Sequence, residues 1–124
     1  MLDNSDVLAM VPVKDIKESE KFYSETLGLK KIDENMAGVT YQCGSGKLFV
    51  YPTPTAGTAK STVATWEVSD IAKVAKELKE KGMEFEHYDY PGATHEGDVH
   101  IWEGAKAAWF RDPSGNILGL SQMK

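Results

Sequence analysis

The sequence has one cysteine, no long apolar run and no surplus of basic residues. Because Cys43 is alone, the chain can form neither an intrachain disulfide nor a zinc site built from cysteines. The net charge of −5 argues against a nucleic-acid partner, since phosphate binding needs a surplus of Lys and Arg on one face. No segment approaches the roughly 20 apolar residues that cross a membrane. Together with the start "MLDNSD", which is neither basic nor apolar, this predicts a cytoplasmic protein without a membrane partner.

What is present is an ordinary globular composition, arranged in two similar halves. With 124 residues, of which 41% are hydrophobic and 27% charged, the chain fits a single domain spanning 1–124. The motif Val-x-Asp-Ile occurs at 13–16 and again at 68–71. In each copy an apolar strand precedes the motif and an amphipathic helix follows it, with Asp15 or Asp70 placed to cap the helix. The repeat predicts two modules of the same design.

Short strands are predicted after each helix, because apolar and polar residues alternate there between turn-forming residues. The predicted strands span residues 29–34, 38–43, 47–51, 83–88, 99–103, 106–111 and 116–121. The segment 52–61, "PTPTAGTAKS", is rich in Pro and Thr and predicts a linker. The expected architecture is an α+β fold of paired βαβββ modules, the first at about 7–52 and the second at about 62–122.

Alternation along the strands assigns the side chains to two faces. In "VATWEV" (63–68), the apolar set Ala64, Trp66 and Val68 is expected under a helix. The opposite, open face is also largely apolar, so we expect it to line a ligand cavity or an interface. The candidate ligand-binding residues on this open face are Leu8, Met10, Phe49, Tyr51, Val63, Thr65, Glu67, Trp109, Arg111 and Gly119. Trp102 and Tyr41 are further aromatic candidates, and such side chains suit either a planar ligand or core and interface packing.

Two longer motifs carry a family resemblance. Together with the Val-x-Asp-Ile helix starts, "FYSETLGLKK" (22–31) and "AWFRDPSGNILGL" (107–119) resemble the vicinal oxygen chelate superfamily, which comprises glyoxalase I, bleomycin resistance proteins and extradiol dioxygenases. The resemblance covers nearly the whole chain. It implies that the paired modules form a curled mixed sheet around a cavity, usually in a homodimer.

The resemblance also implies a metal site, because enzymes of this superfamily hold one divalent metal with His and Glu side chains on equivalent strands. The positions that match these ligands are occupied by Leu8, Phe49, Val63 and Gly119. None of these residues can bind a cation through its side chain. We therefore expect no metal ligands and no cofactor, and an apolar cavity like that of the metal-free, antibiotic-binding members.

Several polar residues admit two interpretations. Desolvation would raise the pKa of Glu67 on the cavity face and make it a base or a partner for a cation, whereas a strand-end Glu67 would be solvated or paired with Arg111. Arg111 either binds an anionic ligand group or is structural. In "PGATHEGDVH" (91–100), the group His95, Glu96, Asp98 and His100 forms either a lid over the cavity or a solvent-exposed loop.

Two functions follow from these observations. The first is a metal-independent, homodimeric protein that binds a small molecule and sequesters an aromatic or cationic compound. The alternative is an enzyme of the same superfamily, a lyase, isomerase or dioxygenase. Its catalytic residues would be Glu67 and His100, or a displaced metal site around 95–103. A scaffold role ranks below both.

Overall fold

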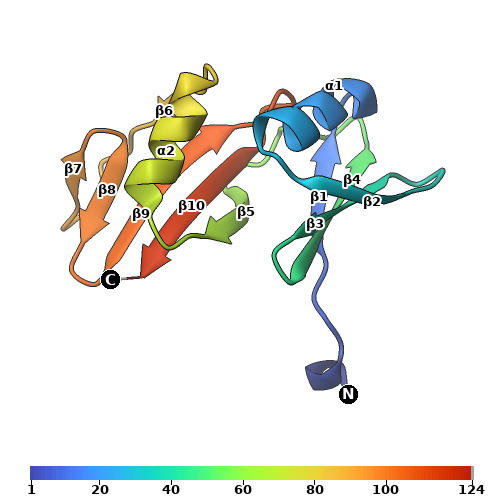
Figure 1. The fold of residues 1–124 in the computed structure, drawn as a ribbon, viewed down its shortest axis with the longest axis horizontal. Helices are drawn as coiled ribbons and strands as arrows, with labels where there is room; N and C mark the ends of the chain where they lie inside the picture. The colour runs from blue at the N-terminus through green and yellow to red at the C-terminus, as the bar shows by residue number, and fades with distance from the viewer. Residues whose placement is uncertain (124) are drawn as a thin grey trace.

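The computed structural model describes residues 1–123, which form two mixed sheets with one helix against each (Figure 1). The first sheet has the order β1-β4-β3-β2. Its strands are β1 (Ala9–Val13), β2 (Lys30–Glu34), β3 (Val39–Cys43) and β4 (Gly46–Pro52). β1 runs parallel to β4, and the other pairs are antiparallel. Helix α1 (Ile16–Lys21) connects β1 to β2 and continues into a π-helical segment at Phe22–Thr26.

The second sheet has the order β5-β10-β9-β8-β7, with β6 paired to β9. Its strands are β5 (Thr62–Glu67), β6 (Phe85–Glu86), β7 (Thr94–Glu96), β8 (Val99–Trp102), β9 (Ala105–Arg111) and β10 (Ile117–Met123). β5 runs parallel to β10, and α2 (Ile71–Glu80) follows β5. The predicted α+β class is confirmed. Of the predicted strand 83–88, only the two residues of β6 form a strand. β7 is not predicted from the sequence.

Both helices begin where the sequence places their caps. The Asp15 carboxylate accepts hydrogen bonds from the amides of Lys17 and Glu18, at 2.9 and 3.1 Å. Asp70 caps α2 in the same way by accepting from Lys73 N at 3.2 Å. These bonds satisfy backbone donors that have no partner inside the helix. Of the helices in residues 1–123, none is long and apolar enough to cross a membrane.

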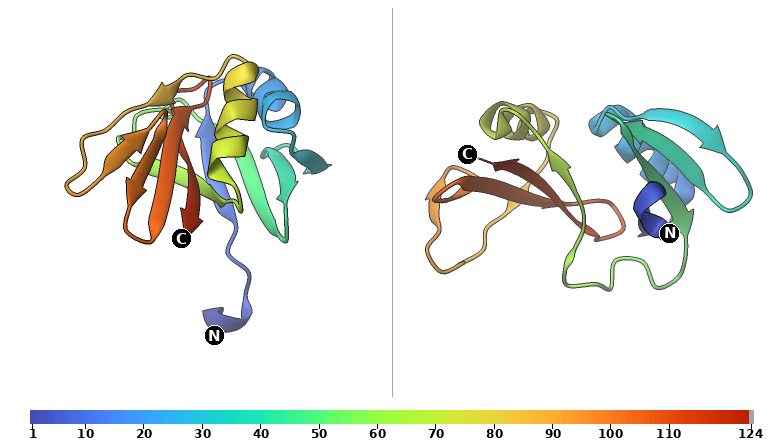
Figure 2. Two further views of the ribbon diagram at one scale, coloured as in Figure 1. Left: turned by 60° about the vertical axis from the view of Figure 1, so that its left-hand side comes forward. Right: turned by 90° about the horizontal axis from the view of Figure 1, so that it is seen from below.

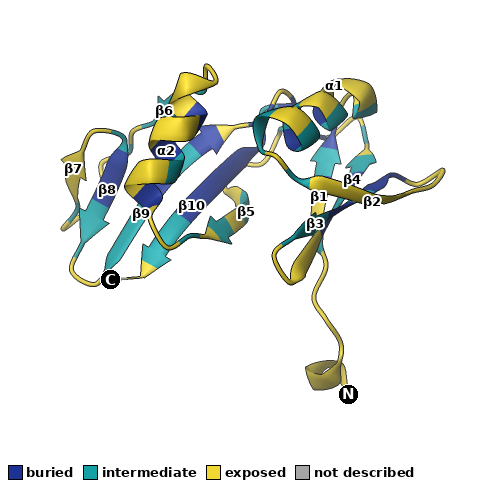
Figure 3. Cartoon of the chain, viewed as in Figure 1, coloured by how far each residue is buried: buried dark blue, intermediate teal, exposed yellow. Residues whose placement is uncertain are grey.

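The core lies between the helices and the sheets. Figure 2 shows both helices on the same side of the two sheets, and Figure 3 shows the buried residues gathered under them. As the alternation predicts, this core takes its strand residues from the helix-facing set. Its buried members include Val11, Val13, Tyr23, Tyr41, Val50, Ile71, Ala108, Phe110, Leu118 and Leu120. The other face of each sheet is left open.

The two halves of the chain are joined by the turn between β9 and β10. The buried Asp112 carboxylate accepts four hydrogen bonds: from the Tyr23 hydroxyl at 2.8 Å, from the Ser114 amide, and from both the amide and the side chain of Asn116. Asn116 Nδ2 also donates to the Pro12 carbonyl, and Lys14 N donates to Ser114 Oγ. Because Pro12, Lys14 and Tyr23 belong to the first half, this turn fixes one half against the other.

The linker is fixed to the same turn. Gly57 has φ +74°, and a Cβ added there would lie 1.9 Å from the Ser114 carbonyl oxygen. Only glycine permits so close an approach of two backbones. Residues 57–61 are therefore held against the second half of the chain.

Replacing Tyr23 with Phe tests this join. The buried Asp112 carboxylate loses one donor, so we expect Tyr23→Phe to lower the free energy of unfolding by about 2 kcal/mol, measured by urea denaturation. Tyr90→Phe removes the same hydroxyl from a half-exposed ring and should cost under about 0.5 kcal/mol. Equal losses in the two variants would contradict a special role for the Tyr23–Asp112 bond.

Candidate functional site

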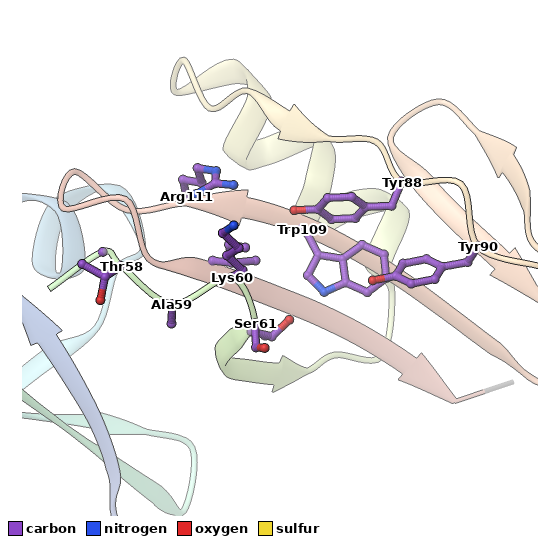
Figure 4. A pocket seen from close by; sticks show the side chains of 11 residues that line it. Thr58, Ala59, Lys60, Ser61, Tyr88, Tyr90, Trp109 and Arg111 are labelled. Carbon is purple, nitrogen blue, oxygen red and sulfur yellow. The ribbon is translucent and has the colours of Figure 1, made fainter. Parts of the chain in front are cut away.

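An open pocket of about 760 Å³ lies on the open face of the second sheet (Figure 4). One wall is the linker strap, residues 57–61, which runs into Thr62 at the start of β5. The other wall comes from β9, β10 and the segment after β6. The lining residues are Gly57, Thr58, Ala59, Lys60, Ser61, Thr62, Tyr88, Tyr90, Trp109, Arg111 and Ile117. The volume falls in the range of pockets that hold small molecules.

Three aromatic rings form one wall of this pocket. Trp109 projects from β9, and its ring centroid lies 5.3 Å from that of Tyr88 and 5.4 Å from that of Tyr90. Tyr90 is 46% exposed and is open to the pocket. Rings at these separations pack edge-on or tilted, and this leaves ring faces available for a planar ligand.

A buried histidine supports the aromatic wall from behind. His100 is 0% exposed, and its ring centroid lies 4.9 Å from that of Trp109. His100 Nε2 accepts a hydrogen bond from Tyr88 N at 2.9 Å, so the neutral ring carries its proton on Nδ1. The prediction that His100 lies in a solvent-exposed loop is wrong. Pairing of His95 with His100 in the β7–β8 hairpin places both rings on the face that Trp109 covers.

The opposite end of the pocket is basic. Arg111 Nε donates to Glu86 Oε1 at 3.0 Å, and its Nη1 donates to the Gly115 carbonyl at 3.0 Å. Arg111 therefore pairs with Glu86, and the alternative pairing with Glu67 is wrong. Sheet register explains the difference: Arg111 and Glu67 lie opposite Ile117 and Ser121 of β10. Four residues of strand separate those positions by roughly 13 Å.

Comparison with known proteins agrees with this architecture. The family model of the Glyoxalase/Bleomycin resistance protein/Dioxygenase superfamily matches residues 7–120. The chain belongs to this superfamily. No curated protein sequence matches it.

Solved structures of the superfamily share the fold over their full length. TnmS3, an antibiotic binding protein from Streptomyces sp. CB03234, is 22% identical with a TM-score of 0.75, and the match covers 100% of this chain and 99% of that one. A glyoxalase family protein from Enterococcus faecalis is 20% identical, with a TM-score of 0.73 and coverage of 98% and 99%. Lactoylglutathione lyase from Agrobacterium tumefaciens is 18% identical, with a TM-score of 0.69 and coverage of 96% and 93%. At these identities, the similarity shows that the fold is shared and nothing more.

The metal site that the resemblance implies does not fit the residues at its four positions. Leu8, Phe49, Val63 and Gly119 have no side-chain donor atoms. Within residues 1–123, no group of three or more His, Cys, Asp or Glu side chains is arranged to hold a metal ion. In the 95–103 segment, Asp98 is turned toward α2, where it binds Lys79 Nζ at 3.2 Å, and it also contacts His87 Nε2 at 2.8 Å. The hydrogen bond from His87, followed by the bond from Lys79, lowers the pKa of Asp98.

The space at Gly119 is already filled. A Cβ added there would lie 3.0 Å from Thr65 Oγ1 and 3.4 Å from both Cδ1 and Nε1 of the Trp109 indole. Gly119 pairs with Trp109 on one side and Thr65 on the other, so both side chains lean over it. A carboxylate at 119 would crowd Thr65 Oγ1 and would start in van der Waals contact with the indole.

The structure does not bring the two predicted catalytic residues together. Glu67 lies opposite Ser121, Ser121 opposite Ala107, and Ala107 opposite His100. This row crosses three strand spacings, which separates Glu67 from His100 by roughly 14 Å. Within one chain, that distance is too long for the two to act on one reacting group.

Of the predicted ligand-binding residues, only Trp109 and Arg111 line the pocket. Leu8, directly before β1, and Met10, within β1, are exposed. Phe49 and Tyr51 stack on each other on β4, with ring centroids 6.4 Å apart. Glu67 borders a separate pocket beside the β3–β4 hairpin. The remaining positions are explained by local packing. Val63 falls at a register shift in the pairing of β5 with β10 and packs against the core. Tyr41 is fully buried, with its ring centroid 5.9 Å from that of Tyr23 in the π-helical segment.

The sequence prediction missed Tyr88, Tyr90 and Lys60. Tyr88 and Tyr90 belong to an irregular segment after β6, where no strand periodicity assigns a face. The pair Tyr-x-Tyr, with the alternate residue Asp89 exposed, is the one available signal. Lys60 lies in the linker, which composition identifies as a connection and not as a pocket wall.

The buried His100 predicts a pH dependence of stability. Burial, followed by the positive charges that His95 and His87 can carry, lowers the pKa of His100 from its usual value. Below about pH 6.5 the unfolded chain gains a proton here that the folded chain does not. The free energy of unfolding should therefore fall as pH falls through the window between this value and the lower folded pKa.

Urea unfolding at pH 7.5 and pH 5.5 checks this expectation. His100→Gln keeps an acceptor for Tyr88 N and removes the titration, so the variant should lose less stability between the two pH values than the natural chain. His87→Gln, which removes a half-exposed ring of the same cluster, should retain most of the loss. An identical pH response in the natural chain and in His100→Gln would show that His100 is not the titrating group.

Proposed function

We propose that this chain is a small-molecule-binding protein that sequesters a planar aromatic compound in the pocket between the linker strap and the second sheet. The observation that carries the proposal is the convergence of Tyr88, Tyr90 and Trp109 on one pocket wall. Stacking on such rings gives affinity without any covalent chemistry. The strap on the opposite side contributes backbone and hydroxyl groups that can orient a ligand.

Two further observations support binding over metal-dependent catalysis. The positions that hold the metal in enzymes of the superfamily have no donor atoms here, and Trp109 occupies the space beside Gly119. TnmS3, which has the same fold over its full length, is described as an antibiotic binding protein. Both features fit a pocket that binds an intact compound and retains it. The cytoplasmic location stays a prediction.

A naphthalene probe tests the pocket. We expect 2-naphthalenemethanol to shift the Trp109 indole N–H resonance saturably, with a Kd of about 2 mM, because a fragment of this size gains about 0.3 kcal/mol per heavy atom. The Trp66 indole, on the helix side of the sheet, is an internal control and should not shift. Trp109→Phe assigns the resonance.

Two tyrosine variants locate the binding surface. Tyr90→Ala should weaken probe binding about fivefold, the equivalent of about 1 kcal/mol of ring stacking. Tyr51→Ala makes the same change on the open face of the first sheet and should leave Kd unchanged. If Tyr51→Ala weakens binding as much as Tyr90→Ala, the ligand occupies a larger surface than this pocket. No saturable shift of Trp109 with the probe would refute the proposal.

We also propose a homodimer, as the family resemblance implies. Leu8 and Met10 are 43% and 49% exposed, and they lie close to the stacked pair Phe49 and Tyr51 on the open side of the first sheet. An apolar surface of this kind marks an interface. Sedimentation velocity should give twice the mass of the chain, and Met10→Glu should shift the protein toward monomer. Met36→Glu, at a fully exposed turn, should leave the dimer intact. A monomer in the natural protein would contradict this proposal.

A further inference from the structure

The charge of the pocket is opposite to that of the chain as a whole. The protein carries a net charge of −5, with 19 acidic and 14 basic residues. The residues that line the pocket nevertheless include Lys60 and Arg111 and no Asp or Glu. Figure 4 shows the amino group of Lys60 and the guanidinium of Arg111 at the same end of the pocket, beyond the aromatic wall.

The two cations have different surroundings. Arg111 is fixed by its bonds to Glu86 and to the Gly115 carbonyl, so Glu86 offsets part of its charge. Lys60 is exposed at the strap and, among residues 1–123, forms no ion pair. Glu67, which is on the same face of the sheet, lies at the far end of β5, roughly 13 Å from Arg111 along the strand direction. A negative group of a ligand would therefore meet an uncompensated Lys60 beside a rigid Arg111.

We propose that the ligand of this pocket is an aromatic compound that carries an anionic group, such as an aryl carboxylate, with its rings on Tyr88, Tyr90 and Trp109 and its anion at Lys60 and Arg111. This inference rests on the function proposed above and narrows its ligand class. The sequence suggests an aromatic or a cationic ligand. The pocket favours an aromatic ligand, but one that carries a negative charge. A cationic ligand would lie against two cations with no lining carboxylate to stabilise it.

The expected preference is modest, because Lys60 is in contact with solvent and water screens its charge. An anion should bind about fivefold tighter than a neutral analogue of the same size at low ionic strength, and the ratio should shrink as salt is added. The cationic analogue should bind more weakly than the neutral one.

Three naphthalenes that differ in charge test this inference: 2-naphthoate, 2-naphthalenemethanol and 2-naphthylmethylammonium. Their Kd values are measured at pH 7.5 from the Trp109 indole resonance, first at low ionic strength and then in 0.3 M NaCl. In Lys60→Gln the ratio between the anion and the neutral probe should fall from about fivefold to less than twofold. Lys76→Gln makes the same charge change on α2, across the sheet from the pocket, and should keep the ratio.

The outcomes distinguish a failure of the anionic ligand class from a failure of the aromatic pocket. If the neutral probe binds and 2-naphthoate binds no tighter, or the cation binds tightest, the anionic class is wrong while the aromatic pocket stands. If none of the three shifts Trp109, both proposals fail. If Lys76→Gln lowers the ratio as much as Lys60→Gln, the preference comes from overall charge, and the assignment to Lys60 and Arg111 is overturned.

Discussion

The hydrogen bonds of the buried Asp112 carboxylate hold this fold together. The two halves share one hydrophobic core, and the turn that contains Asp112 adds directed hydrogen bonds between them through Tyr23 and Asn116. Burial and the adjacent carboxylate raise the pKa of Tyr23, so its hydroxyl stays a donor. The same turn packs closely against Gly57 and in this way positions the strap. The pocket wall therefore depends on a carboxylate that never faces the pocket.

Much of this architecture can be predicted from local patterns. The capping aspartates, the turn residues 112–116 and the apolar alternation each act over a few residues, so each can be recognised in the sequence. The register between strands and the path of irregular segments depend on distant contacts. Arg111 pairs with Glu86 across β6 and β9, and Tyr88 is placed by the buried His100, and neither contact leaves a periodic signal. For this reason the open face could be predicted, whereas the position of the pocket on it could not.

The aromatic wall is held by contacts that leave no periodic signal in the sequence. Tyr88 lies on an irregular segment, yet its amide is held by His100, and His100 is enclosed by Trp109, Trp102 and His95. Packed rings and one hydrogen bond hold this segment in place of the backbone hydrogen bonds of a regular strand. A binding surface that is ordered before its ligand arrives loses little conformational entropy on binding.

The contact between Gly119 and the Trp109 indole limits what can replace either residue. A side chain at 119 would begin with its Cβ 3.0 Å from Thr65 Oγ1 and in van der Waals contact with the indole, so further atoms would press on both neighbours. Losing Trp109 alone would open a cavity beside His100, and adding a side chain at 119 alone would crowd Thr65 and the indole. Neither change is favourable without the other. Residue 119 is therefore coupled through packing to residues 65 and 109, and a metal ligand at 119 would still need donor side chains at positions 8, 49 and 63.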